Sequence, residues 1–135
     1  MLTAKRTSLR PGSGRHTWTV RLLAGLTLLA ILLIFVQASF AGQFLVGSGN
    51  ALERHELLGS ALLPLAAILQ FIAAILMWRP GRRSPLPILL TAVEFVLIAF
   101  QITWGYEREL ALHVPNALVI LTLQFFLLGV VRRGE

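Results

Sequence analysis

The sequence predicts an all-α integral membrane protein, folded as a four-helix up-down bundle with its N and C termini in the cytoplasm. Of its 135 residues, 56% are hydrophobic and only 13% are charged. A soluble domain of this length cannot bury that much apolar surface, because small folds keep a large share of their residues exposed. The apolar residues also form four long blocks, which is typical of membrane spans. We therefore expect the lipid bilayer of the cell inner (plasma) membrane to surround most of the chain.

The bundle is expected over residues 17–135, after a basic cytoplasmic tail at residues 1–16. Glycine, serine and asparagine residues between the first two spans predict an outer loop at 42–54. Pro64 lies inside the second span, where membrane helices tolerate a proline and kink at it. Pro115 is expected in the first turn of the fourth span, where a missing N–H costs little. The four expected spans cover about residues 20–41, 57–78, 86–104 and 110–131.

Positive charge gathers at three places, which an even number of spans puts on one side of the membrane. The formal net charge is +6. Because cytoplasmic segments carry the excess of Lys and Arg, we expect all three places to face the cytoplasm. No basic fold interleaved with aromatic residues is left outside the spans, so we expect no nucleic-acid partner. The clustered residues are Lys5, Arg6, Arg10, Arg15 and Arg21, then Arg79, Arg82 and Arg83, then Arg132 and Arg133.

The chain contains no cysteine. This excludes thiolate metal sites, iron–sulfur clusters and covalently attached c-type heme. The sequence also has no Ser–His–Asp, HExxH, Walker or GxGxxG pattern. We therefore expect no catalytic constellation of these kinds, and whether the chain is an enzyme stays open.

Two histidines stand at matching places, each near the start of an expected span and both on the outer side. His55 opens the second span and His113 opens the fourth, and these two spans are diagonal in an up-down bundle. Neutral imidazole ligates iron, and a pair of imidazoles holds a six-coordinate b-type heme for electron transfer. Gly59 and Ala117 each follow a histidine by four residues, so they would leave room for a flat macrocycle one turn deeper. The pattern predicts that His55 and His113 bind one heme iron.

Simpler roles exist for the residues at this end of the bundle. Both histidines could be interfacial residues that cap helix starts and stay wet on one side. Arg54 and Arg108 could pair with heme propionates at the outer surface. They could equally be ordinary solvated loop charges, because each has acidic neighbours in the sequence, namely Glu53, Glu56, Glu107 and Glu109.

Polar side chains inside the spans should face the bundle interior, because lipid cannot satisfy amide or carboxyl groups. Glu94 lies near the expected bilayer midplane, where burial favours its neutral form, and Gln70 and Gln124 are plausible partners at similar depth. Two interpretations of Glu94 are open. In the functional one it is a proton relay or a quinone-facing acid, and in the structural one it only forms a hydrogen bond between helices. Gln37 and Gln101 each precede a histidine in their hairpin, which makes a weak parallel repeat.

These residues carry a resemblance to a known family. The run from Gln37 to Leu45 (QASFAGQFL), the segment His55-Glu-Leu-Leu-Gly59, Gln101, and the segment His113-Val-Pro-Asn-Ala117 together resemble one four-helix half of heme A synthase. They also resemble small uncharacterised bacterial four-helix membrane proteins with the same histidine pattern. The resemblance implies that His55 and His113 are the axial pair of a heme on the outer side.

The chain departs from that family in two ways. Heme A synthase has two such halves, and this sequence has one. The catalytic half of the family carries a glutamate three residues before its first histidine, whereas this position is Leu52 here, with Glu53 and Glu56 nearby. The heme-holding scaffold therefore carries over, and the hydroxylating activity does not.

The sequence thus predicts a membrane protein that binds heme b through His55 and His113 near its outer face. Electron transfer or heme handling would be its role, as a small subunit of a larger membrane redox complex or as a homo-oligomer. A second hypothesis is a cofactor-free accessory subunit that stabilises a membrane complex. A third is a small proton-coupled transporter that uses Glu94.

Overall fold

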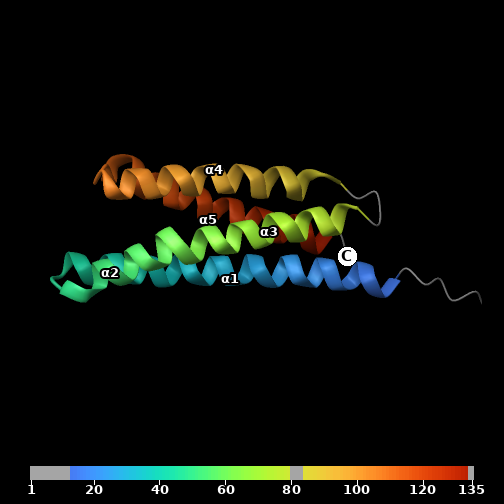
Figure 1. The fold of residues 1–135 in the computed structure, drawn as a ribbon, viewed down its shortest axis with the longest axis horizontal. Helices are drawn as coiled ribbons and strands as arrows, with labels where there is room; N and C mark the ends of the chain where they lie inside the picture. The colour runs from blue at the N-terminus through green and yellow to red at the C-terminus, as the bar shows by residue number, and fades with distance from the viewer. Residues whose placement is uncertain (1–12, 80–83, 134–135) are drawn as a thin grey trace, which may run out of the picture.

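The computed structural model describes residues 13–79 and 84–133. Within these ranges the chain is helical except at short turns, and four stretches are long and apolar enough to cross a membrane (Figure 1). The first is α1 (Ser13–Leu45), the third is α4 (Leu86–Tyr106) and the fourth is α5 (Leu110–Arg133). The second stretch consists of α2 (Gly49–Leu57), the π-helix η1 (Leu58–Leu62) and α3 (Leu63–Trp78). The predicted all-α class and multi-pass membrane character are confirmed.

The ends of the spans differ from the sequence prediction. The expected outer loop at 42–54 is wrong, because α1 continues to Leu45 and α2 begins at Gly49. The turn needs only residues 46–48, with Gly47 at φ 94° and its N–H bonded to the carbonyl of Phe44 at 3.0 Å. Residues 51–54 are good helix formers, which outweighs the preceding glycines. At the other end α1 already begins at Ser13, inside the expected tail, and residues 1–12 of that tail lie outside the described residues.

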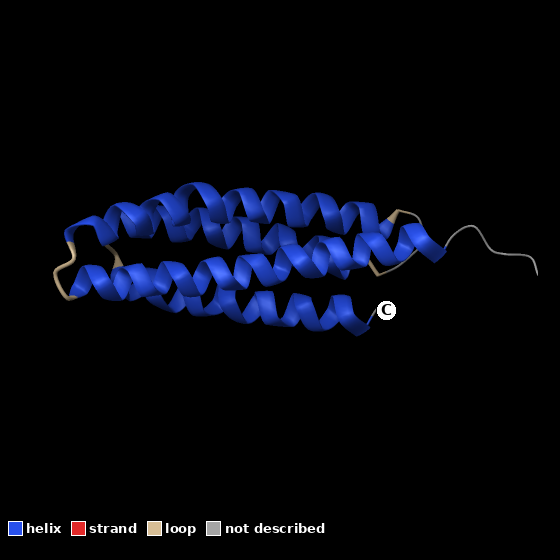
Figure 2. Ribbon diagram, turned by 90° about the horizontal axis from the view of Figure 1, so that it is seen from below, coloured by secondary structure: helices blue, strands red, loops and turns tan. Residues whose placement is uncertain are grey.

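The helices form a bundle in which each one packs along two neighbours. α1 and α4 each pack against both α3 and α5, so α1 lies diagonally across from α4, and α3 lies diagonally across from α5. The start of α1, the end of α3, the start of α4 and the end of α5 share one end of the bundle, called here the terminal end (Figures 1 and 2). The opposite end carries α2 and the turn between α4 and α5, and it is called here the histidine end.

Both prolines inside the second and fourth spans change the local helix. Pro64 is the second residue of α3, which begins directly after η1. A proline cannot donate to the carbonyl four residues earlier and clashes with it, and a π-helix is one way in which a helix accommodates this. Pro115 lies inside α5 and not in its first turn, so that expectation is wrong. The carbonyl of Ala111 loses its usual helical donor there, at an exposed position near the histidine end.

The interior alternates between apolar and polar layers along the bundle. An apolar cluster of seven buried residues fills the terminal end, namely Val20, Leu23, Ala73, Ala74, Met77, Leu127 and Val131. A second apolar cluster of Ala67, Ile98 and Ile120 lies nearer the histidine end. Buried polar side chains from all four spans occupy the other levels. Lipid offers no hydrogen bonds, so these side chains must find partners within the bundle.

The internal repeat is more extensive than the glutamine and histidine markers indicated. The sequences of the diagonal helices α1 and α4 match at a spacing of 64 residues. Leu-Thr occurs at 26–27 and again at 90–91, Leu-Ile occurs at 33–34 and 97–98, and Gln occurs at 37 and 101. The matched threonines behave alike, because Thr27 and Thr91 each donate to the carbonyl four residues earlier, at 2.8 and 2.9 Å. The triplet Leu-Gln-Phe likewise recurs at 69–71 in α3 and 123–125 in α5. The two hairpins therefore present equivalent residues to the interior.

Candidate functional site

The fold brings His55 and His113 together across the bundle. His55 lies on α2 and His113 near the start of α5, and both rings are half-buried at the histidine end. Their ring centroids are 6.0 Å apart, and the ring planes meet at 54°. The diagonal packing of the second and fourth spans accounts for this approach, as the sequence predicted.

Each imidazole is held by a backbone carbonyl from a neighbouring helix. His55 Nδ1 lies 3.0 Å from the carbonyl oxygen of Gln37 on α1, and His113 Nδ1 lies 2.9 Å from that of Gln101 on α4. A carbonyl oxygen only accepts, so in each pair Nδ1 is the donor and carries the proton. In a neutral ring this leaves Nε2 with a free lone pair. A metal-ligating histidine is commonly oriented in this way, with its other nitrogen bonded to a carbonyl or carboxylate.

The ring separation matches that of two imidazoles on one metal. A metal–nitrogen bond is about 2 Å long, and the ring nitrogen lies about 1 Å from the ring centre, which together put two opposed ring centres about 6 Å apart. No group of three or more His, Cys, Asp or Glu side chains suited to a metal occurs within residues 13–79 and 84–133. Two protein ligands suit a metal that arrives with its own equatorial ligands, as iron does in heme.

Glycine at Gly105 makes room for one of the rings. A Cβ atom there would lie 3.0 Å from His113 Cε1 and 3.2 Å from its Nδ1, closer than ordinary packing. Gly105 is one turn after Gln101 on α4, so carbonyl and glycine together form the seat of the His113 ring. The sequence analysis did not identify this contact between Gly105 and the histidine.

Gly59 has a different role from the predicted one. A Cβ atom at Gly59 would collide with the side-chain amide of Gln37, so the small residue makes room for that amide and not for a macrocycle. Gln37 Nε2 in turn lies 3.5 Å from the carbonyl oxygen of His55. Gln37 thus supports the first histidine both through its backbone and through its side chain. Ala117, the matching residue on α5, is half-buried one turn beyond His113.

A second brace, also missed by the sequence reasoning, fixes the helix that carries His113. Asn116 donates from Nδ2 to the carbonyl oxygen of Leu97 at 2.9 Å and to Gln101 Oε1 at 2.7 Å. These bonds tie α5 to α4 three residues after the histidine. The signal that could have identified it is a polar residue inside a span, close to one helical turn after the histidine.

The charged residues at the histidine end are exposed. The guanidinium of Arg54 lies over the ring of Phe40 at 5.8 Å from its centroid, which is within the range of a cation–π interaction. Arg108 occupies the turn between α4 and α5 at φ 61°. Both lie at the same end as the histidines, and their pairing with propionates stays a prediction. The exposed acids at this end are Glu53, Glu56, Glu107 and Glu109.

A separate polar layer, called here the Glu94 layer, crosses the bundle between the two apolar clusters. It contains one side chain from each span, all 0–1% exposed: Thr27, Gln70, Glu94 and Gln124. Gln124 Nε2 donates to Glu94 Oε1, so the predicted contact between Glu94 and Gln124 is confirmed. Gln70 bonds to Gln124, at 2.9 and 3.3 Å, and is linked to Glu94 only through Gln124. Gln70 Nε2 also lies 3.3 Å from Thr27 Oγ1, a partner that the sequence reasoning missed.

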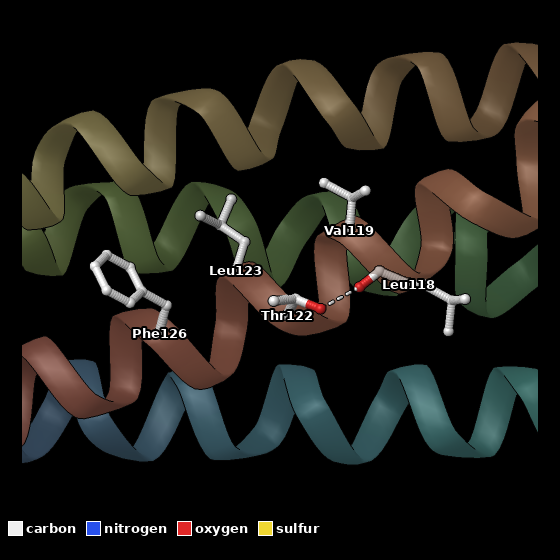
Figure 3. A pocket seen from close by; sticks show the side chains of 5 residues that line it. All are labelled: Leu118, Val119, Thr122, Leu123 and Phe126. Atoms are coloured by element: carbon white, nitrogen blue, oxygen red, sulfur yellow. Dashed lines mark hydrogen bonds between the residues drawn. The ribbon is translucent and has the colours of Figure 1, made fainter.

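A shallow groove of about 420 Å³ lies on the outer face of α5 (Figure 3). Leu118, Val119, Thr122, Leu123 and Phe126 line it. Its one hydroxyl, on Thr122, already donates to the carbonyl of Leu118 at 2.8 Å. An apolar recess on an outward-facing helix is what lipid chains fill, so the groove carries no chemistry and the histidine pair remains the candidate site.

The geometry defines a multi-pass α-helical membrane protein with a pair of oriented imidazoles at one end of its bundle. Comparison with protein-family models, curated proteins and solved structures gave no match to this chain. The resemblance to half of heme A synthase therefore stays a prediction from the motifs.

The seat formed by Gly105 can be tested through the tautomer of His113. We expect Gly105→Ala to push the ring away from the carbonyl of Gln101, because the new methyl group would lie within 3.0–3.2 Å of it. The lost hydrogen bond is worth about 1 kcal/mol, so the ratio of the Nδ1-protonated to the Nε2-protonated tautomer of His113 should fall about fivefold. Nitrogen-15 NMR of labelled histidine measures this ratio.

The matched control is Gly129→Ala on α5, where a Cβ atom meets nothing within 4 Å. It should leave both histidines unchanged, and Gly105→Ala should leave His55 unchanged. A His113 ring that keeps its wild-type tautomer in Gly105→Ala would contradict the proposed seat.

Proposed function

We propose that this chain is a membrane b-type cytochrome, which binds one heme through His55 and His113 for electron transfer or heme handling. The observation that carries the proposal is the pair of imidazoles with centroids 6.0 Å apart, each with its Nδ1 held by a backbone carbonyl. With Nδ1 bonded in this way, each neutral ring keeps its Nε2 lone pair available to a metal.

The residues of the chain would bind and orient the group without catalysing a reaction. Such a heme supplies a one-electron couple between ferric and ferrous iron. The carbonyls of Gln37 and Gln101 hold the ligand rings in the required tautomer, and Asn116 keeps α5 against α4 beside His113. Arg54 and Arg108 are cationic side chains at the histidine end, and they would pair with the propionates of such a heme. Strong preorganisation of both ligands suits electron transfer, because a fixed coordination shell changes little between oxidation states.

We place the bundle in the cell inner membrane, with its terminal end facing the cytoplasm and its histidine end facing the outer side. The Arg side chains described at the terminal end are Arg21, Arg79, Arg132 and Arg133, and excess positive charge stays on the cytoplasmic side. The acids Glu53, Glu56, Glu107 and Glu109 lie at the other end. A heme near that face would exchange electrons with a partner on the outer side or within the membrane, such as a larger redox complex.

The absorption spectrum of the purified protein tests the proposal. After expression with ample heme, the wild-type chain should show a Soret band and, once reduced with dithionite, an α-band near about 560 nm. His55→Ala and His113→Ala should each lose the six-coordinate spectrum, because one axial ligand is gone. Asn50→Ala, an exposed change at the same end, serves as a control that keeps it.

A wild-type protein without heme, or variants that keep the wild-type spectrum, would contradict the proposal. A protein that is heme-free and tolerates both histidine variants would instead support a cofactor-free accessory subunit.

The orientation can be tested with single cysteines, since the natural chain has none. Ser48 lies exposed in the turn at the histidine end, and Ser84 lies exposed at the terminal end. In spheroplasts, a membrane-impermeant maleimide should label Ser48→Cys at once, and Ser84→Cys only after the membrane is permeabilised. The opposite pattern would overturn the proposed orientation.

A further inference from the structure

The hydrogen bonds of the Glu94 layer leave one atom without a partner. Each of the two amide nitrogens carries two hydrogens, and both are used. Gln70 Nε2 bonds to Thr27 Oγ1 and Gln124 Oε1. Gln124 Nε2 bonds to Gln70 Oε1 and Glu94 Oε1. The hydroxyl of Thr27 donates to the carbonyl of Leu23. No donor of the layer is left for Glu94 Oε2, which is buried without a partner among the described residues.

An unpartnered carboxylate oxygen at this depth is costly. Glu94 is 1% exposed, and a buried ion needs both a counter-charge and hydrogen bonds to remain charged. The side chains that face it from the three other spans, Thr27, Gln70 and Gln124, carry no charge and do not ionise near neutral pH. A proton on Oε2 removes the charge, so the isolated chain holds Glu94 as a neutral acid. The carboxylate becomes favourable only when positive charge enters the bundle.

The histidine site is close enough to supply that charge. Glu94 precedes Gln101, whose carbonyl holds His113, by seven residues on α4, a rise of about 10 Å. The side chains between the two levels are apolar, namely Ala67, Ile98 and Ile120. A charge acts much more strongly across such a medium than across water.

We propose that Glu94 takes up a proton when the histidine site is reduced by one electron and releases it on oxidation, an inference that rests on the proposed heme. The positive charge of the oxidised heme core favours the Glu94 carboxylate. When a one-electron reductant removes that charge, the carboxylate takes one proton from water, forming an O–H bond at Oε2. One electron and one proton enter together, and the net charge of the bundle interior does not change.

The test compares the pH dependence of the midpoint potential in the wild-type holoprotein and in Glu94→Gln, a change that keeps the acceptor for Gln124. The wild-type potential should fall as pH rises, because the reduced state binds the proton. Glu94→Gln should lose that part of the slope, and Glu109→Gln, an exposed acid at the histidine end, should keep it. Equal slopes in the wild-type protein and Glu94→Gln would overturn the inference.

Infrared spectroscopy supplies a second readout of the proton itself. Reduction should produce a protonated-carboxyl C=O band that shifts in D₂O and is absent in Glu94→Gln. The heme-free wild-type chain should show the same band at neutral pH, and its absence there would also overturn the inference. Failure of the chain to bind heme would remove any redox transition and overturn both proposals. A heme-loaded protein with equal slopes overturns only this one.

Discussion

Lipid supplies no hydrogen bonds, and this constraint organises the whole interior of the bundle. Polar side chains in a span must find partners within the protein, either on another helix or at a carbonyl of their own helix. Several of them gather at defined levels and cross-link the spans. Gln70, Gln124 and Glu94 meet at one level, and Gln101 and Asn116 meet at another. The apolar cluster of Ala67, Ile98 and Ile120 lies between these two levels, and the other apolar cluster fills the terminal end. Because hydrogen bonds are directional, the polar levels help to set the register that brings the second and fourth spans to matched depth.

The same constraint explains the geometry of the histidines. A half-buried imidazole needs a partner for its N–H, and a helix usually leaves few carbonyls free. His55 bonds to the backbone carbonyl of Gln37 on α1, and His113 bonds to that of Gln101 on α4. The same contact thus occurs once in each of the two similar hairpins. Each pair orients a ring and fixes its tautomer at once. The proposed heme site rests on two such rings, whose centroids are 6.0 Å apart.

Much of this arrangement could be predicted from the sequence. Four apolar blocks predict four spans because a helix needs about 20 apolar residues to cross a bilayer. The approach of His55 to His113 follows from the diagonal order of an up-down bundle. The helix ends could not be predicted, because Gly42 and Gly49 are typical of turns and yet lie in helices. The roles of Gly105 and Gly59 depend on which side chain fills the space beside them, and residue spacing does not contain that information.

The central claim is that both imidazoles bind the same iron. The electron paramagnetic resonance spectrum of the oxidised, heme-loaded protein addresses it most directly, because the spin state reports the number of strong axial ligands. Two axial imidazoles should give a low-spin ferric signal. Nitrogen-15 labelling of histidine should then alter the hyperfine coupling of two axial nitrogens. A high-spin signal, or coupling to one labelled histidine alone, would contradict it.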